Sequence, residues 1–177
     1  MGKTKVITGK LRLNYVNVFK PKAIDLESDP KYSATLIIPK TDIKTVNQIL
    51  KALEVATEHI RENYKEHNIQ DTVICVKDGD KEKPTEKHYN NSYFINATSK
   101  YKPGIVDTNL NEITDETQIY SGCYARCSIT FYPYNQEGKI GIGCSLENLQ
   151  KLSDGELLGR SSATDDFSTP YEEELLI

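Results

Sequence analysis

The residues best suited to chemistry occupy alternate positions of one predicted strand, Ser121 to Asn135. Its odd positions are apolar and suit a core, whereas its even positions carry phenols, hydroxyls and a guanidinium: Tyr124, Arg126, Ser128, Thr130, Tyr132 and Tyr134. Alternate residues of a strand share one face and repeat about every 7 Å. Aromatic rings that stack on bases, together with cations that bind phosphates, are typical of surfaces that hold single-stranded nucleic acid.

The same mixture of aromatic and basic residues recurs elsewhere in the chain. It is found in Lys10-x-Arg12-x-x-Tyr15, Phe19-Lys20-Pro21-Lys22, Lys31-Tyr32 and Lys100-Tyr101-Lys102. The chain has 11 tyrosines and no tryptophan. The tyrosines of the strand could instead cover another sheet or a helix, but their recurrence beside basic residues favours nucleic-acid binding.

The sequence contains none of the common catalytic motifs. It has no G-x-S-x-G elbow, no P-loop, no G-x-G-x-x-G opening a helix and no H-E-x-x-H. Its four cysteines include no C-x-x-C pair, which predicts buried reduced thiols rather than zinc ligands or disulfides. We interpret Asp78-Gly79-Asp80 as a turn and Gly141-Ile142-Gly143 as a bend within a strand. We therefore expect no enzymatic activity, no cofactor and no metal.

Charge divides the chain into a body and a tail. The whole chain has 22 Lys+Arg and 26 Asp+Glu, and residues 161–177 hold five carboxylates and no basic side chain, so residues 1–160 keep 22 against 21. The five are Asp165, Asp166, Glu172, Glu173 and Glu174. Such a composition is typical of a disordered, extended segment. The tail either only solubilises the protein or mimics a polyanion, screening a cationic groove and contacting partners.

Strand and helix patterns predict one domain, residues 1–160, before the flexible tail at 161–177. Residues 6–19 and 32–38 have strand patterns, and a helical stripe capped by Thr41 or Asp42 runs from residue 43 to about 67. Strands are also predicted at 72–76 and 92–99, on either side of a long polar loop at 77–91, and the strongest strand pair is 118–135 with 139–145. The inward side of the first strand changes after Leu13, which predicts a β-bulge near Asn14.

These elements favour a mainly β domain, a barrel or sandwich decorated by the long helix. No apolar run approaches the roughly 18 residues that a membrane span needs. The basic N-terminus leads into no signal-type apolar stretch. We therefore expect a cytoplasmic protein without a membrane partner.

Recognisable blocks of residues run along nearly the whole chain. The earlier blocks are Tyr15–Pro21, Lys31–Lys40, Asp78–Asp80, Tyr93–Lys100 and Pro103–Asp107. The later blocks are Tyr120–Tyr124, Phe131–Asn135, Gly138–Ile142, Leu146–Lys151 and Asp154–Gly159. In this order the blocks resemble the single-stranded-DNA-binding protein family of tailed phages.

The resemblance implies an OB-fold-like five-stranded barrel that coats single-stranded DNA during phage replication, recombination and repair in the host cytoplasm. It also implies that the acidic tail contacts phage or host replication proteins, and it leaves a homodimer open. A plain OB-fold carries its helix between the third and fourth strands, whereas the pattern here places the helix after the second. Either a strand is hidden in residues 6–19 or the helix is a decoration.

We expect a DNA-binding face made of Tyr124, Arg126, Tyr132 and Tyr134, with support from Arg12, Lys100 and Lys102. Phe19 and Tyr32 are expected to stack at the edge of the groove, and the tail carboxylates to compete with DNA. Two alternatives are a protein-interaction barrel with a solubilising tail and an RNA-binding protein, because stacking surfaces do not by themselves read the 2′-hydroxyl.

Overall fold

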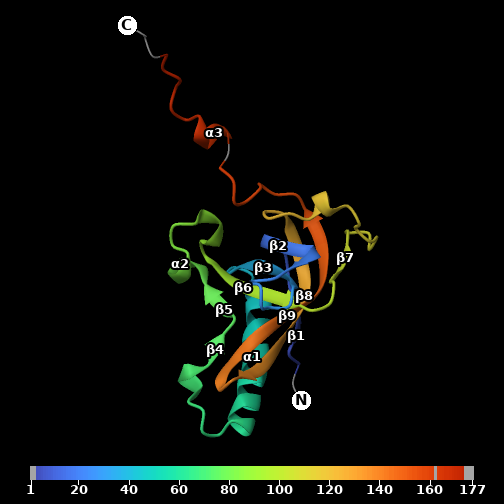
Figure 1. The fold of residues 1–177 in the computed structure, drawn as a ribbon, viewed down its shortest axis with the longest axis vertical. Coiled ribbons are helices and arrows are strands. Elements are labelled where there is room, and N and C mark those ends of the chain that lie inside the picture. Colours follow the sequence, from blue (N-terminus) through green and yellow to red (C-terminus); the bar gives the residue numbers. More distant parts are fainter. Residues whose placement is uncertain (1–2, 162, 174–177) are drawn as a thin grey trace.

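Five long strands form a closed ring of hydrogen-bonded pairs. The computed structural model describes residues 3–161 and 163–173 (Figure 1). In ring order the strands are β2 (Leu11–Lys22), β3 (Lys31–Pro39), β6 (Ser92–Ser99), β9 (Lys139–Ser153) and β8 (Tyr124–Gln136), and β8 pairs with β2 again. All pairings in the ring are antiparallel except that of β6 with β9. The predicted mainly β, OB-like fold is confirmed.

Four short strands extend this ring to a sheet of nine strands within the described residues. β1 (Lys5–Ile7) pairs with β8, and β5 (Val76–Asp78) pairs with β6. Both β4 (Val73–Ile74) and β7 (Gly104–Val106) pair with β9. The predicted strand at 72–76 is therefore two strands, because the chain leaves β9 after residue 74 and joins β6 at residue 76. The five longest strands alone close the ring.

The long helix α1 (Ile43–Asn63) lies between the second and third strands of the ring, as the sequence predicts. Asp42 caps it by accepting a hydrogen bond from the Thr45 amide. Figure 1 shows the helix beside the β8–β9 hairpin. Its buried side chains recur every three to four residues, which gives the helix one face toward the sheet. They are Thr45, Ile49, Ala52, Ala56 and Ile60.

The other helices are short. They are α2 (Gly79–Glu82), α3 (Ala163–Asp166) and the 3-10 turns Ile69–Asp71, Lys87–Tyr89 and Glu116–Gln118. No helix of the described residues is long and apolar enough to span a membrane.

The described tail residues are all exposed and extend away from the ring (Figure 1). The tail contains the single helical turn of α3. Asp165 and Asp166 are the last two residues of this turn. Glu174 lies outside the described residues.

Side chains alternate along β8 as predicted. The odd positions Ala125, Cys127, Ile129 and Phe131 are buried in the core. The even positions lie on the outer side, and their exposure ranges from intermediate to exposed. The strand pattern therefore separates core from surface correctly.

The four cysteines are free thiols. Cys123, Cys127 and Cys144 are buried, and Cys75 is partly buried. Burial raises the pKa of Cys75 to about 11, and it raises the pKa of each of the other three. Thiols with raised pKa values stay protonated near neutral pH and are poor nucleophiles. The described residues contain no group of three or more side chains that could hold a metal ion.

Strand β2 contains the β-bulge that the sequence predicts. Its pairing with β3 steps from Asn14 opposite Thr35 to Asn17 opposite Ser33, so two β2 residues face one residue of β3. The inward side of the strand changes at this point. As a result, both halves of β2 place apolar side chains in the core, namely Leu11, Leu13 and Val18.

Two glycines allow the chain that follows β9 to cross the start of β8. A Cβ on Gly122 would lie 1.9 Å from the carbonyl oxygen of Glu156, and one on Gly155 would lie 2.1 Å from that of Gly122. The φ of Gly122 is 116°, a conformation that favours glycine. Arg12 joins the two crossing segments, because its Nε donates to Gly122 O at 3.1 Å and its Nη2 to Glu156 O at 2.8 Å.

Gly122→Ala is expected to lower the free energy of unfolding by about 3 kcal/mol, from strain and overpacking together. The melting temperature should then fall by about 6–12 °C. Gly138→Ala is the matched control, because Gly138 also has a positive φ (86°) but a Cβ there would meet nothing within 4 Å. Calorimetry on both variants tests this, and equal losses of melting temperature would contradict the role given to the crossing.

Candidate nucleic-acid interface

Tyr132 and Tyr134 lie side by side near the C-terminal end of β8, and each packs over a glycine of the neighbouring strand β9. They pair with Gly143 and Gly141 of β9. A Cβ on Gly143 would lie 2.6 Å from the Tyr132 ring, and one on Gly141 would lie 2.4 Å from the Tyr134 hydroxyl. The ring centroids are 6.5 Å apart, and Tyr132 is 41% exposed. The glycines thus leave room for two outward rings, and this part of β9 is a regular strand rather than the predicted bend.

A row of polar side chains runs from Tyr132 across the ring. The phenol of Tyr132 lies close enough to Thr98 of β6 to interact with it, and desolvation is the main cause that raises the pKa of this phenol. Thr98 pairs with Ser33 of β3, and Asn17 of β2 donates from Nδ2 to Ser33 Oγ at 3.4 Å. Thr35 of β3 donates to Asn96 Oδ1 of β6 at 2.7 Å beside this row. These groups can hydrogen-bond to bases, sugars or phosphates.

Sequence reasoning missed this polar row, although the sequence carries a signal for it. Ser33 and Thr35 alternate with Ala34 and Leu36, and Asn96 and Thr98 alternate with Ile95 and Ala97. A period of two with polar residues on one side indicates a wetted face. The signal is weak because each strand supplies only two polar positions. Only the pairing of β3 with β6 joins them into one row.

The opposite end of the same outer face is covered. Ile37 of β3 and Phe94 of β6 form a small apolar cluster with Tyr89, whose ring lies 5.1 Å from that of Phe94. Asn14 of β2 donates from Nδ2 to the Tyr89 hydroxyl at 2.9 Å. Tyr89 belongs to the segment 79–91, so this segment closes one end of the face and leaves the polar row open.

The segment 79–91 is anchored by an ion-pair cluster. Lys40 lies 2.8 Å from both Asp78 and Asp80, and its ammonium lies 5.1 Å from the Tyr93 ring centroid. Hydrogen bonds from Lys40 hold the pKa values of both carboxyls below their usual range. Asp78 also caps α2 by accepting a hydrogen bond from the Asp80 amide. The interpretation of Asp78-Gly79-Asp80 as a simple turn is corrected, because Asp78 ends β5 and caps α2, and Gly79 and Asp80 begin that helix.

Tyr124 and Arg12 lie together near the start of β8, away from Tyr132 along the strand. They pair across β2 and β8, and the Tyr124 ring has Lys10 at 4.7 Å and Arg12 at 5.4 Å from its centroid. The hydrogen bonds of Arg12 to two backbone carbonyls commit part of its guanidinium to the fold. Lys10, which was not among the predicted site residues, is the more accessible cation at this ring.

A carboxylate interrupts the predicted face in the middle of β8. Glu147 of β9 accepts a hydrogen bond from Thr130 at 2.6 Å and forms an ion pair with Lys5 at 3.1 Å, and both lower its pKa. Arg126 is exposed and donates to Gln150 Oε1. The even positions of β8 therefore do not form one continuous aromatic and basic surface, because β9 places an acidic group between Arg126 and Tyr132.

The remaining predicted residues are Tyr32, Phe19, Lys100 and Lys102. Tyr32 pairs with Ser99, one step along from the pair of Ser33 and Thr98. The Lys102 ammonium lies 5.4 Å from the centroid of the Phe19 ring. Lys100 and Lys102 are exposed at the end of β6. Lys102 therefore lies beside Phe19, which packs against the core, whereas alternation along β3 places the Tyr32 side chain on the opposite face from Ser33.

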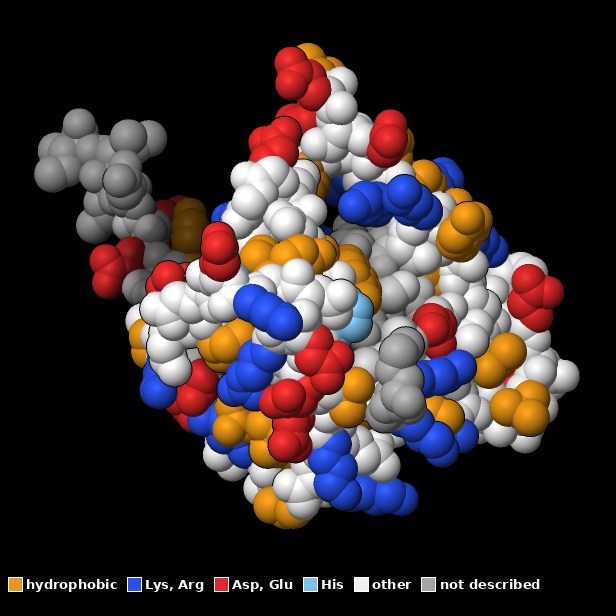
Figure 2. Space-filling view, turned by 90° about the horizontal axis from the view of Figure 1, so that it is seen from below, with side chains coloured by type: hydrophobic (Ala, Val, Ile, Leu, Met, Phe, Trp, Pro, Cys, Tyr) orange, Lys and Arg blue, Asp and Glu red, His pale blue; other side chains and the backbone are white. Residues whose placement is uncertain are grey.

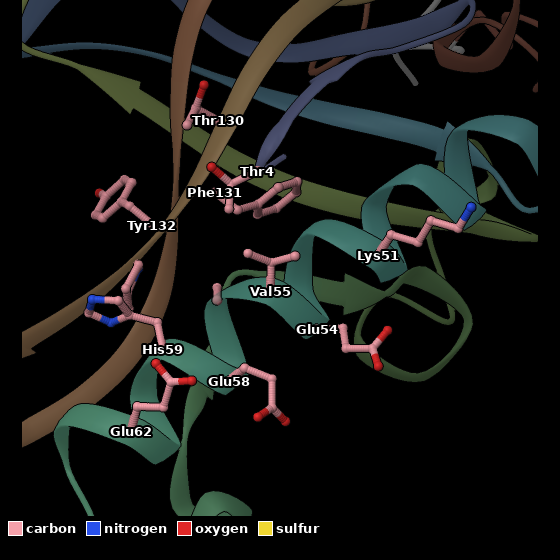
Figure 3. A pocket seen from close by; sticks show the side chains of 12 residues that line it. Thr4, Lys51, Glu54, Val55, Glu58, His59, Glu62, Thr130, Phe131 and Tyr132 are labelled. Carbon is pink, nitrogen blue, oxygen red and sulfur yellow. The ribbon is translucent and has the colours of Figure 1, made fainter. Parts of the chain in front are cut away.

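A cavity of about 930 Å³ lies between α1 and β8, and Figure 3 shows it. Its lining is largely apolar and includes Val55, Phe131 and Tyr132, but Glu54, Glu58 and Glu62 line it along the helix. Three carboxylates disfavour phosphates here. The face shown in Figure 2 carries acidic and basic side chains interspersed, without a field of one sign. The polar row therefore suits a nucleic acid better than this cavity does.

Comparison with known proteins places these features in a family. Residues 4–176 match the family described as "Enterobacter phage Enc34, ssDNA-binding protein". Protein p50 of Acyrthosiphon pisum secondary endosymbiont phage 1 is 28% identical over 184 residues, which cover 97% of this chain and 98% of that protein. A family of single-stranded-DNA-binding proteins agrees with the prediction that the chain is not an enzyme.

Solved structures share the fold. The single-stranded DNA-binding protein from bacteriophage Enc34, in complex with ssDNA, gives a TM-score of 0.76 at 21% identity over 88% of this chain and 90% of that chain. Gp2.5, a single-stranded DNA binding protein encoded by bacteriophage T7, gives 0.65 at 17% identity over 99% of each chain. With a family match over nearly its whole length, the chain belongs to the Enc34 phage single-stranded-DNA-binding protein family.

Proposed function

We propose that this protein binds single-stranded DNA without sequence preference, on the open part of the outer face of β3 and β6. The observation that carries the proposal is the pair of tyrosines seated on glycines beside a row of polar side chains. In OB-folds the second and third strands form the ligand face, and β3 and β6 are the second and third strands of this ring.

Each group of residues has a distinct role in this proposal. Tyr132 and Tyr134 stack on bases. Lys100 and Lys102 bind phosphates, and Arg126 contributes a more distant cation. Arg12 mainly supports the fold and the position of Tyr124. Because stacking accepts every base, the binding is expected to depend little on sequence.

The biological setting follows from the family. We infer that the protein coats single strands during phage DNA replication, recombination and repair in the cytoplasm of the host cell. The Enc34 relative, solved in complex with ssDNA, supports this reading. We propose DNA rather than RNA as the ligand because of this likeness. Parallel titrations with dT and rU oligomers distinguish DNA binding from RNA binding.

We also propose that the acidic tail competes with DNA and recruits replication proteins. Asp165, Asp166, Glu172 and Glu173 are exposed, and Glu174 continues the run beyond the described residues. The tail also exposes Phe167 and Tyr171, at 81% and 90%, between these carboxylates. Exposed rings among carboxylates resemble stacked bases among phosphates, and they also offer a partner both charge and apolar surface.

Replacing Tyr132 and Tyr134 together by alanine is expected to weaken binding to a labelled dT oligomer by about 2 kcal/mol or more, roughly 30-fold in Kd. Fluorescence anisotropy measures the effect, and unchanged melting temperature shows that the fold is intact. The matched control is the double variant with phenylalanine, which keeps the stacking rings and should bind nearly as wild type. If the phenylalanine variant loses as much as the alanine variant, the rings do not act by stacking.

The salt dependence of the same titration tests phosphate binding. The logarithm of the binding constant should fall with the logarithm of salt concentration, with a slope near −0.7 for each neutralised phosphate. Absence of binding at low salt, with and without the tail, would instead favour the protein-interaction alternative.

Removal of residues 161–177 is expected to tighten DNA binding, most at low salt. The reason is that the truncation removes five carboxylates that compete with DNA phosphates. At physiological salt this competition is screened beyond a Debye length of about 8–10 Å, so its effect is largest at low salt. A full-length variant with all five carboxylates replaced by amides is the matched control, and it should bind as tightly as the truncated protein. Equal affinities of intact and truncated protein at low salt would reject competition.

A further inference from the structure

Tyr15 has a backbone conformation that costs energy. Its φ is 46°, in the left-handed region, which tyrosine rarely adopts. A non-glycine residue there costs on the order of 1–3 kcal/mol, and glycine would avoid most of this cost. Tyr15 nevertheless occupies the extra position of the β2 bulge. Strain of this kind persists only where the surrounding structure holds it.

Two asparagines hold Tyr15 in this conformation. The Tyr15 amide donates to Asn14 Oδ1 at 2.9 Å, and Asn17 Nδ2 donates to the Tyr15 carbonyl at 3.2 Å. Asn14 is itself fixed, because it is buried and donates to the Tyr89 hydroxyl at 2.9 Å. The backbone of Tyr15 is therefore well restrained on both sides.

The side chain of Tyr15 receives little packing in return. It is 61% exposed and does not belong to the hydrophobic core. A buried ring would repay the backbone strain with apolar burial, but an exposed ring does not. The fold thus holds a large aromatic side chain in solvent at an energetic cost, which indicates a use outside the fold.

Tyr15 lies at the β2 end of the polar row. Its neighbours Asn14 and Asn17 pair with Thr35 and Ser33 of β3, and the row continues through β6 to Tyr132. Three strand steps along the ring, from β2 to β3, to β6 and to β9, separate the two ends. The two exposed rings are therefore separate positions joined by hydrogen-bonding groups.

We propose that Tyr15 is a second base-stacking position of the interface, at the opposite end of the polar row from Tyr132. This inference rests on the proposed binding of single-stranded DNA. A strand that crosses β6 and β3 stacks one base on Tyr132 and a later base on Tyr15. The asparagines keep the second ring outward before DNA arrives, which lowers the entropic cost of binding.

The test uses substitutions that separate fold from binding. Tyr15→Gly removes both the ring and the strain, so its melting temperature should stay the same or rise. Its affinity for a dT oligomer should fall by about 5- to 100-fold. Tyr15→Phe is the matched control and should bind nearly as wild type. If Tyr15 had only a structural role, Tyr15→Gly would instead lower the melting temperature and leave the affinity for dT unchanged.

A second measurement reports on stacking directly. The chain has no tryptophan, so Tyr15→Trp creates a single fluorescent probe. Its emission should be quenched as dT binds, whereas Tyr171→Trp, in the tail, should change much less. Absence of quenching at saturation, or wild-type affinity of Tyr15→Gly, would overturn the inference while leaving the proposed function intact. Failure of the wild-type protein to bind dT at low salt would overturn both.

Discussion

The pairing of β2 with two neighbours is the constraint on which the rest of the structure depends. Arg12 pairs with β3 on one side and with β8 on the other, and this double pairing closes the ring. A closed sheet must bend, and a bulge supplies the bend while changing which side of the strand faces inward. Apolar side chains then fill the interior from both halves of β2. The polar side chains of β2, β3 and β6 are left together on the outside.

One end of the outer face of these strands is covered and stabilises the fold, whereas the other end is open and is the proposed binding surface. At one end the segment 79–91 seals Ile37 and Phe94 under Tyr89, and Lys40 fixes the segment through two carboxylates. At the other end the polar row is open. The body of the chain is close to neutral, and the face shown in Figure 2 has no field of one sign. Aromatic rings and hydrogen-bonding groups characterise the open end.

The sequence was sufficient for features that depend on local periodicity. The inward positions of β8, the helical period of α1 and the bulge near Asn14 each follow from residues close together in the chain. It was insufficient where distant strands meet. Glu147 interrupts the β8 face from β9, and the carbonyls bound by Arg12 come from residues 122 and 156. Periodicity says which way a side chain points, but it does not say what lies beside it.

The seating of Tyr132 and Tyr134 on glycines also constrains how this sequence can vary. Any side chain at position 143 or 141 would occupy the space of the opposing ring or hydroxyl. A larger residue there is tolerated only if the tyrosine becomes smaller or turns away. Positions 132 and 143, and likewise 134 and 141, should therefore change together in evolution, as coupled pairs rather than as four independent sites.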